Sequence, residues 1–302
     1  MTRDEILQAF DGIRVWQRGD RRAVHKPLLV LYALAKVNAG AAAMTDWNDA
    51  EPVLKELLEE FGPDGSAATR HNPFWHLRTD GLWQLAGPPN ILERAPSATP
   101  TLTELRDKHV RCGFPPGLHE ALRNDPQLVA AIAQRIVDAH FPESIRSDVL
   151  AAVGLPADLS VSLSTADATR RREPAFREKV LLAYQYRCCV CGHDLRLGRQ
   201  TIGLEAAHIK WFQARGPDTV PNGLALCSLH HKVFDLGAFT VLPGTWQMVF
   251  SQHLNGSDET ARKTLAYHGA GLILPQSTEY LPRAEFLEWH RREVFKEPSR
   301  SN

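Results

Sequence analysis

The strongest chemical signal in the sequence is a pair of closely spaced cysteine and histidine motifs in the second half of the chain. Two residues separate Cys188 from Cys191, and the same spacing separates Cys227 from His230 further along. This spacing lets a tight turn place both side chains of a pair on one tetrahedral zinc ion. Since four protein ligands complete the coordination shell, we expect a structural zinc site that joins the two ends of the segment.

Three further polar residues in this segment are not needed for zinc. His208 falls in a predicted strand (Leu204–Ile209), Asn222 in a turn, and His231 on a predicted helix directly after His230. A strand, a turn and a helix that converge on one zinc site would bring the three together. One histidine could take a proton from water, the other could hold a divalent metal on a phosphate, and the asparagine could orient a ring. The alternative is two buried structural histidines and a turn-forming asparagine.

These residues resemble a known family when they are taken with the flanking cysteines. The strings Glu205–Ile209, Asn222–Leu224 and Cys227–Asp235 look like the HNH endonucleases of the ββα-metal fold, and in particular their McrA-type branch. The resemblance covers roughly residues 172 to 250. It implies that His208 is the general base, that Asn222 orients His208 or the metal site, and that His231 binds Mg²⁺ or Mn²⁺. That metal would polarise the scissile phosphate and neutralise charge on the leaving oxygen.

The chain departs from this family at one position. Many relatives have an acid or a histidine directly before the base as a second metal ligand, and this chain has Ala207 there. Glu205 lies on the same face of the predicted strand as Ala207, and Asp235 lies one helical turn after His231. Either carboxylate could supply the missing ligand.

The first half of the chain has two clusters of cations that could contact DNA. One precedes an apolar helix, and the other mixes cations with aromatic residues. Cations of this kind, together with the N–H groups of a helix start, can bind phosphates. The alternative is a helix cap and a hairpin whose aromatic residues pack in the core. The first cluster comprises Arg14, Arg18, Arg21, Arg22, His25 and Lys26, and the second runs from Arg70 to Arg78.

The same regions resemble the sulfur-binding domain of phosphorothioation-dependent restriction endonucleases. The resemblance rests on the strings His25–Leu29, Asn72–Phe74 and Thr79–Trp83, on the order of the two domains, and on the tail Phe286–His290. In a phosphorothioate, sulfur replaces one non-bridging oxygen of the phosphate. Sulfur is larger and accepts hydrogen bonds poorly, so an apolar socket admits it and penalises a buried oxygen.

On this resemblance we assign candidate DNA contacts in the first half. Pro73, with the stems of Asn72 and His76, is the candidate sulfur socket. Relatives carry an aromatic residue directly before this proline and a small residue near position 76, and the chain departs from that pattern at both positions. The candidates for the neighbouring phosphate oxygens and bases are Arg18, His25, Lys26, Arg70 and His71.

The pattern of apolar residues predicts an α+β protein. We expect a mainly helical DNA-binding domain with a small β-hairpin over residues 1–150, a linker over 151–172, and a zinc-stabilised ββα-metal nuclease domain with a C-terminal extension over 173–302. Asn72–Leu85, which is aromatic and contains Asp80-Gly81, is the expected hairpin. The expected helices are Arg3–Phe10, Lys26–Ala39, Asp49–Phe61, Leu118–Asn124, Gln127–Phe141 and about Pro174–Tyr186.

Composition excludes several classes of protein. Apolar residues make up 43% and charged residues 23% of the 302 residues, which is typical of a globular chain. The longest strongly apolar run, Pro27–Ala35, is too short to span a membrane, and the acidic start is unlike a signal peptide. We therefore expect a cytoplasmic protein. Five cysteines do not make a disulfide scaffold, and we expect Cys189 and Cys112 to pack in the interior.

The net charge of zero conceals an uneven distribution. Between Ala168 and Lys232 there are 11 lysines and arginines against 5 acids. A local basic field of this kind suits a polyanion such as nucleic acid, although a solvated surface without a ligand has the same composition.

Together these observations predict a type IV-like restriction endonuclease that binds phosphorothioated double-stranded DNA and cuts both strands near the mark. Cutting both strands with one nuclease site per chain suggests a homodimer. One alternative is an HNH endonuclease directed to another mark such as methylcytosine, although we see no signature of the base-flipping pocket that base readers need. The other is a non-catalytic, zinc-stabilised DNA-binding regulator.

Overall fold

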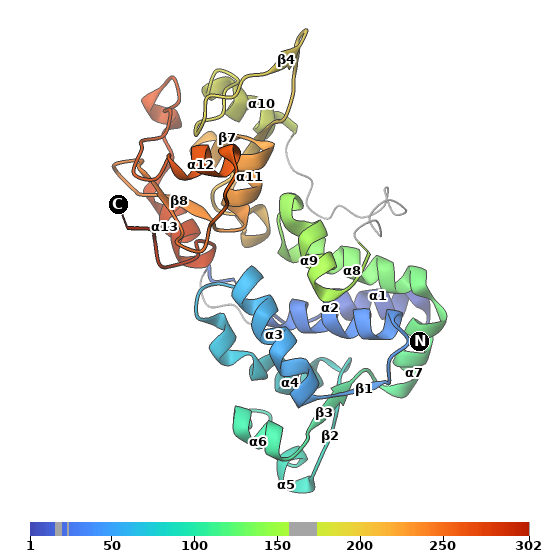
Figure 1. Cartoon of the computed structure of the whole chain (residues 1–302). Helices are drawn as coiled ribbons and strands as arrows, with labels where there is room; N and C mark the ends of the chain where they lie inside the picture. Colours follow the sequence, from blue (N-terminus) through green and yellow to red (C-terminus); the bar gives the residue numbers. More distant parts are fainter. Residues whose placement is uncertain (16–19, 23, 157–173, 302) are drawn as a thin grey trace. The chain divides into compact units, whose positions relative to one another are not determined.

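The computed structural model describes residues 1–15, 20–22, 24–156 and 174–301. The chain divides into two compact units, Met1–Ala166 and Asp167–Asn302, each of which has its own core (Figure 1). Arg18 and the basic run Arg170–Arg172 lie outside the described residues. Residues 157–172 of the predicted linker lie outside them too, and its first residues continue the helix Arg146–Val153.

The first unit is built on the buried helix α2 (His25–Asn38). Nine of its 14 residues are buried, which explains why the sequence around Pro27–Ala35 is apolar on all sides. Pro27 lies in the first turn, where its missing N–H group costs no intrahelical hydrogen bond. Helices α3, α4, α7, α8 and α9 pack around α2 (Figure 1).

The other elements of this unit are short. Capping boxes of Thr2 with Glu5 and of Thr101 with Glu104 begin two of its helices. The helices are α1 (Arg3–Asp11), α3 (Trp47–Phe61), α4 (His71–His76), α5 (Pro89–Leu92), α6 (Leu102–Asp107), α7 (Pro116–Asn124), α8 (Pro126–His140) and α9 (Arg146–Val153), with 3₁₀ turns η1 (Ser66–Thr69), η2 (Leu77–Asp80) and η3 (Glu143–Ile145).

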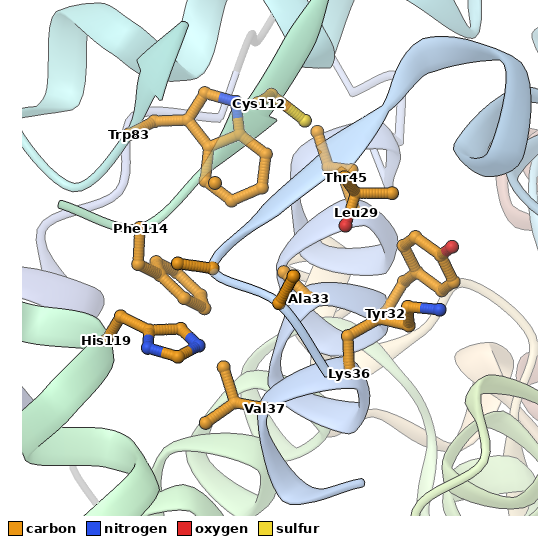
Figure 2. A pocket seen from close by; sticks show the side chains of 13 residues that line it. Leu29, Tyr32, Ala33, Lys36, Val37, Thr45, Trp83, Cys112, Phe114 and His119 are labelled. Carbon is orange, nitrogen blue, oxygen red and sulfur yellow. The ribbon is translucent and has the colours of Figure 1, made fainter. Parts of the chain in front are cut away.

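A small antiparallel sheet completes the first unit. Its strands are β1 (Met44–Asp46), β2 (Gln84–Ala86) and β3 (Arg111–Gly113), with β3 in the centre. Cys112 of β3 pairs with Thr45 on one side and Leu85 on the other, and its side chain is buried as expected. A small pocket lies between α2 and this sheet, and Figure 2 shows Tyr32 and Lys36 of α2 beside it.

The predicted hairpin over Asn72–Leu85 is wrong. Residues 71–76 form α4, residues 77–80 form η2, and only Gln84–Ala86 is a strand. The aromatic residues that suggested a strand, Phe74 and Trp75, are fully buried on successive positions of a helix, and Pro73 occupies its first turn. Core packing over so short a segment overrides the strand preference of aromatic side chains. The mainly helical character of the first domain is confirmed.

The second unit is centred on a β-hairpin followed by a helix. Strands β6 (Leu204–His208) and β7 (Gly223–Cys227) are antiparallel, with His208 opposite Gly223 and Leu204 opposite Cys227. Helix α11 (Ser228–Asp235) begins directly after β7 and packs on both strands, while α10 (Pro174–Ala183) also contacts them. This strand, strand, helix order is the ββα arrangement that the sequence predicted.

The remaining elements of the second unit surround that hairpin. The buried His290 of α13 stacks on Phe234 of α11 and donates to or accepts from Thr240, so the C-terminal tail supports the back of α11. These elements are β4 (Arg196–Leu197), β5 (Gln200–Thr201), η5 (Phe212–Ala214), η6 (Val220–Asn222), β8 (Phe239–Val241), β9 (Met248–Phe250), α12 (Glu259–Leu265), η7 (Thr278–Tyr280) and α13 (Ala284–Glu293). Among the described residues, no helix has the length and apolar character needed to cross a membrane.

Candidate active site and metal centre

The four residues with metal-ligand spacing meet in one place. The ligand atoms of Cys188, Cys191, Cys227 and His230 all lie within 4.8 Å of one another. The Nδ1 atom of His230 lies 3.1 Å from the Sγ of Cys227 and 3.6 Å from that of Cys188. Bond lengths of about 2.0–2.3 Å around a tetrahedral zinc ion separate its ligands by roughly 3.5–3.8 Å, so this cluster fits a bound metal.

The electrostatics of this cluster also suit a cation. Hydrogen bonds from Cys191 and Cys227 hold the pKa of the Cys188 thiol far below its usual range, so a thiolate is favoured there. Burial alone would lower the pKa of His230, but the sulfurs of Cys188 and Cys227 outweigh it and raise the pKa to about 9. A thiolate-rich, buried group of this kind is the ligand set that zinc prefers.

His208 lies at the end of β6 and pairs with an aspartate from the following loop. Its Nε2 atom is 2.7 Å from Oδ1 of Asp218, and both side chains are largely buried. Its ring stacks on that of Phe176 of α10 with centroids 4.1 Å apart and planes 16° apart, and Phe212 lies beside it. Two sides of the imidazole are therefore defined by neighbouring residues.

Asn222 acts on the loop between β6 and β7. Its Nδ2 donates to the carbonyl oxygens of Lys210 (3.0 Å) and Pro217 (2.9 Å), and its Oδ1 accepts from the amide of Lys210 (2.8 Å). The side chain is fully buried. A single amide thus holds together the two ends of the loop that carries Asp218, and its influence on His208 runs through that loop.

His231 lies between two carboxylates. Its Nδ1 is 2.5 Å from Oε2 of Glu205 on β6, and its Nε2 is 3.1 Å from Oδ2 of Asp235, one turn along α11. Burial alone lowers the pKa of His231, but the two carboxylates raise it to about 9. The hydrogen bond from His231 lowers the pKa of Glu205 to about 2, and Ser228 donates to the same carboxylate.

Glu205 and His208 of β6 contact different helices. Residues alternate along β6, so Glu205 reaches His231 of α11, whereas His208, three residues further, faces Phe176 of α10. Glu205 and His208 are three residues apart on β6, which corresponds to about 10 Å at the usual strand rise. The hairpin thus has His208, paired with Asp218, at the end closed by its connecting loop, and His231, paired with Glu205 and Asp235, beside the cysteine cluster at its other end.

The predicted DNA contacts of the first unit gather where α2 begins. The Nε2 of His25 is 3.0 Å from the carbonyl oxygen of Ser66 and from the hydroxyl of Thr69, just before α4. Burial lowers the pKa of His25, His71 and His76, and nearby cations, Arg70 for His71 and Lys26 for His76, lower it further in the latter two. Burial thus favours the neutral form of these histidines, which offers hydrogen bonds without charge.

Several of these candidates already have partners inside the unit. Asp80, whose side chain is 2% exposed, pairs with Lys26 and with Arg14. Arg70 pairs with Glu51 of α3 at 2.6 Å. The Nε2 of His76 lies 3.0 Å from the Thr99 hydroxyl.

The candidate socket is less open than the sequence suggested. Pro73 is buried, and its neighbours Asn72 and His76 are partly exposed. A ligand at this point would meet the stems of Asn72 and His76 before it reached the proline ring.

The basic excess of the second unit includes exposed arginines near the hairpin β4–β5. Arg187, Arg196 and Arg199 are exposed. Within the described residues, no carboxylate lies at ion-pair distance from any of the three. They are therefore available to a polyanion.

Sequence reasoning missed two residues of these sites. Asp218 lies ten positions after its partner His208, and no spacing rule links a carboxylate in a loop to a histidine on a strand. Asp80 lies in Thr79–Trp83, one of the strings that resemble the sulfur-binding domain. Its pairing with both Lys26 and Arg14, however, depends on the fold. A local signal existed only for Glu205 and Asp235, which share faces with their neighbours at strand and helix spacing.

Comparisons with known proteins match both halves of the chain. Residues 3–158, just over half of the chain, match the family described as ScoMcrA-like, DNA sulfur-binding domain. Residues 188–242 match the family described as HNH endonuclease. A search of curated proteins gave no match.

The solved structures that match are distant in sequence. The sulfur binding domain of ScoMcrA complexed with phosphorothioated DNA is 22% identical, with a TM-score of 0.43 over 49% of this chain and 97% of that one. The corresponding domain of SprMcrA, in a complex of the same kind, is 19% identical, with a TM-score of 0.44 over 53% and 97%. The type IV phosphorothioation-dependent restriction endonuclease ScoMcrA is 20% identical, with a TM-score of 0.44, and this chain spans 33% of its length and aligns over 56% of its own.

The two matched segments fall in different compact units, and the second contains the cysteine cluster, His208, Asn222 and His231. The first contains α2 and α4 with their cluster of histidines and cations. The chain thus belongs to the ScoMcrA-like DNA sulfur-binding domain family and carries an HNH endonuclease domain behind that domain.

Proposed function

We propose that this chain is a type IV-like restriction endonuclease that recognises phosphorothioated double-stranded DNA and hydrolyses phosphodiester bonds near the modification. A sulfur-binding domain followed by an HNH endonuclease domain is the composition of a McrA-like restriction nuclease. We assign DNA recognition to residues 1–150 and cleavage to residues 173–302, with residues 151–172 as the linker. As a nuclease that screens DNA inside the cell, it is proposed to be cytoplasmic.

One observation carries the proposal. The ββα unit holds His208 against Asp218 and His231 against Asp235, and the cysteine cluster anchors the same helix. A histidine paired with a carboxylate and a second histidine beside a carboxylate are the parts that phosphodiester hydrolysis by a general base and a divalent metal requires. A DNA-binding regulator would need neither pair.

The roles follow from these contacts. His208 accepts a proton from the attacking water, and Asn222 keeps the neighbouring loop in place through Lys210 and Pro217. The exposed arginines near β4–β5 contact phosphates and position the duplex. Cys188, Cys191, Cys227 and His230 hold a structural Zn²⁺ that fixes the start of α11 relative to β6.

The catalytic metal is proposed to be Mg²⁺ or Mn²⁺ held by His231 and Asp235. Their Nε2 and Oδ2 atoms are 3.1 Å apart, and two neighbouring ligands of an octahedral ion with bonds of about 2.1 Å lie about 3 Å apart. Asp235 then supplies the carboxylate that Ala207 lacks. Glu205 accepts from Nδ1 and leaves Nε2 for the metal. When bound, such an ion polarises the scissile phosphate.

Selection for sulfur is assigned to the cluster at the start of α2 and along α4. The neutral histidines His25, His71 and His76 and the stem of Asn72 form a weakly polar surface beside the buried Pro73. Burying a phosphate oxygen there without enough donors costs about 1–3 kcal/mol, and sulfur avoids most of that cost. Lys26 and Arg70, and Arg18 beyond the described residues, would bind the adjacent phosphates.

A cleavage assay tests both halves of the proposal. Two duplexes of identical sequence, one with a single phosphorothioate of defined stereochemistry, are incubated with the protein and Mn²⁺ or Mg²⁺. We expect only the modified duplex to be cut. Equal cutting of both would remove the sulfur selector and favour a nuclease directed to another mark or to none, and methylcytosine duplexes would then be compared.

Substitution of the proposed base separates cleavage from binding. We expect His208→Ala to lower the rate of cleavage about 10²–10⁴-fold, the contribution of general-base catalysis, and to leave the affinity for the modified duplex unchanged. Gel-shift and cleavage assays on the same preparation measure the two properties. Cleavage by this variant at the wild-type rate would show that the base lies elsewhere.

A further inference from the structure

We infer that Asp218 is the positioning residue of the general base His208. It holds the imidazole as the tautomer with its proton on Nε2, so that Nδ1 is the ring nitrogen that accepts a proton from water. The inference rests on the proposed function, because it concerns how the proposed base is prepared for catalysis. It assigns a role to a loop residue that neither the spacing of motifs nor the matched families specify.

The contact between the two side chains has the geometry of a charge-assisted hydrogen bond. Nε2 of His208 and Oδ1 of Asp218 are 2.7 Å apart, and the side chains are 7% and 17% exposed. An ionised carboxylate only accepts hydrogen bonds, so the shared proton belongs to Nε2 of His208. In the neutral ring the other nitrogen, Nδ1, then carries the lone pair.

The surroundings fix the plane of the ring as well as its tautomer. Phe176 stacks on the imidazole almost in parallel, and Phe212 lies at a centroid distance of 6.0 Å. Stacking alone permits a half-turn about the Cβ–Cγ bond, which would exchange the two ring edges. The hydrogen bond to Asp218 distinguishes the edges and so selects one orientation.

The loop that carries Asp218 is itself held tightly. The Asn222 amide binds Lys210, near the start of the loop, and Pro217, directly before Asp218. Gly216 lies so close to Lys210 that a Cβ atom there would be 1.8 Å from its carbonyl oxygen, so only glycine fits without a backbone shift. Asp218 follows two residues later, and its place opposite His208 is therefore set by the backbone of a constrained loop.

This arrangement gives Asn222 and Asp218 separate tasks. Asn222 braces the loop, and Asp218 transmits that constraint to the base. A purely structural ion pair would explain the same distance but would not connect Asp218 to turnover. The two possibilities differ in their kinetic and spectroscopic consequences, since an oriented base affects the chemical step and a structural pair affects stability and binding.

The kinetic test uses Asp218→Asn, which keeps the shape, and Asp218→Ala, with Asp194→Asn as a matched control at an exposed carboxylate of the same unit. We expect both Asp218 variants to lower kcat for phosphorothioated duplex with Mn²⁺ on the order of 10²-fold and to leave KM within about twofold. In a His208→Ala background, Asp218→Ala should have no further effect on the residual rate. An unchanged kcat, or equal loss in the His208→Ala background, would overturn the inference.

The spectroscopic test does not require cleavage. In the full chain labelled with ¹⁵N-histidine, His208 is assigned by its absence from the His208→Ala spectrum. We expect wild-type His208 to show the Nε2–H tautomer and the Asp218→Ala variant to show a mixture or the opposite tautomer. If the wild-type protein shows the Nε2–H tautomer but cuts no modified duplex, the proposed function is refuted and the pairing of His208 with Asp218 stands. If the tautomer is unaltered in Asp218→Ala, the positioning role of Asp218 is refuted.

Discussion

His231 is the residue on which the proposed catalytic metal site is built. Glu205 and Asp235 contact its two ring nitrogens, and they come from a strand and from the same helix, respectively. Glu205 is partly exposed and also accepts from Ser228, whereas Asp235 is buried. This asymmetry suits Glu205 to orienting the ring and Asp235 to sharing an ion with it.

Removing the charge of Glu205 should weaken metal binding without removing a ligand. We expect Glu205→Gln to raise the Kd for Mn²⁺ about 10–100-fold, as loss of an outer-shell carboxylate behind a ligating histidine usually does. Calorimetric titration of the protein with Mn²⁺ measures the effect, and Glu259→Gln on exposed α12 is the control. Identical Mn²⁺ affinities in both variants would leave Glu205 no role in the metal site.

At the scale of elements, Glu51 ties together three segments of the first unit. Its carboxylate on α3 accepts from Arg70, which precedes α4, and from Arg106 of α6. The hydrogen bond from Arg106, opposed by burial and reinforced by Arg70, lowers the pKa of Glu51 below its ordinary value. A carboxyl with a lowered pKa in the folded state stabilises that state above its unfolded pKa, and the contribution is lost as pH falls through the folded value.

This linkage predicts a pH-dependent effect of Glu51→Gln. At pH 7 we expect the free energy of unfolding of the variant to be lower by on the order of 2 kcal/mol. Two arginines would then face a neutral amide in a mostly buried site and lose their ionic partner. The difference from the wild type should shrink as pH falls below about 4.3, the pKa of an unperturbed glutamate, because the unfolded chain binds the proton more readily than the folded one. Thermal unfolding at several pH values measures it, and a difference that stays constant down to pH 3 would contradict the assignment.

We expect the cysteine cluster, with the zinc proposed for it, to stabilise the second unit. It joins the segment before β4 to the end of β7 and the first turn of α11. Bound zinc contributes roughly 10–16 kcal/mol to the folding of small metal-dependent domains at neutral pH. The unit has an apolar core of its own, so the loss on removing a ligand should be large but not complete.

Two neighbouring cysteines provide a matched comparison. We expect Cys188→Ala to lose the bound zinc and most of the circular dichroism of the second unit, and Cys189→Ala to keep one zinc per chain. Cys189 is fully buried, and burial raises the pKa of its thiol, which suits packing and not ligation. Metal analysis by mass spectrometry distinguishes them, and equal zinc loss in both variants would show a general loss of folding.

At the scale of the whole molecule, recognition and cleavage reside in separate units. Each unit has its own core, and the matched families divide in the same place. One nuclease site per chain can attack one strand at a time, so cutting both strands of a duplex is proposed to need two chains. The proposed homodimer follows from this stoichiometry.

Mixing experiments test that stoichiometry. When wild-type protein is mixed with an excess of His208→Ala, we expect nicked modified DNA to accumulate while linear product falls, because most pairs then contain one active site. Gel separation of nicked and linear plasmid carrying phosphorothioates measures the ratio. A decline of linear product without nicks would indicate that each chain cuts both strands in turn.

The helices of the first unit were largely predictable because their apolar residues recur at helical spacing. Helix α3 begins within two residues of its expected start and ends at Phe61 as expected. The structure of residues 72–85 could not be predicted in the same way, because this segment holds only a few aromatic residues between polar ones. So short a pattern fits a strand or a helix turn equally well. The packing of Phe74 of α4 against Trp47 of α3 favours the helix, and this contact between two helices is not visible in the local sequence.

By itself the sequence determined the chemistry of the second unit: the cysteine cluster, the strand with His208, the turn with Asn222 and the helix with His231. Short spacings signal these features, since two residues between ligands let a tight turn place both side chains on one ion, and residues four apart on a helix lie on one face. Only the tertiary structure decided that Asp218 pairs with His208, and that Lys26 shares Asp80 with Arg14. Loop closure and core packing bring these partners together, and no local pattern encodes them.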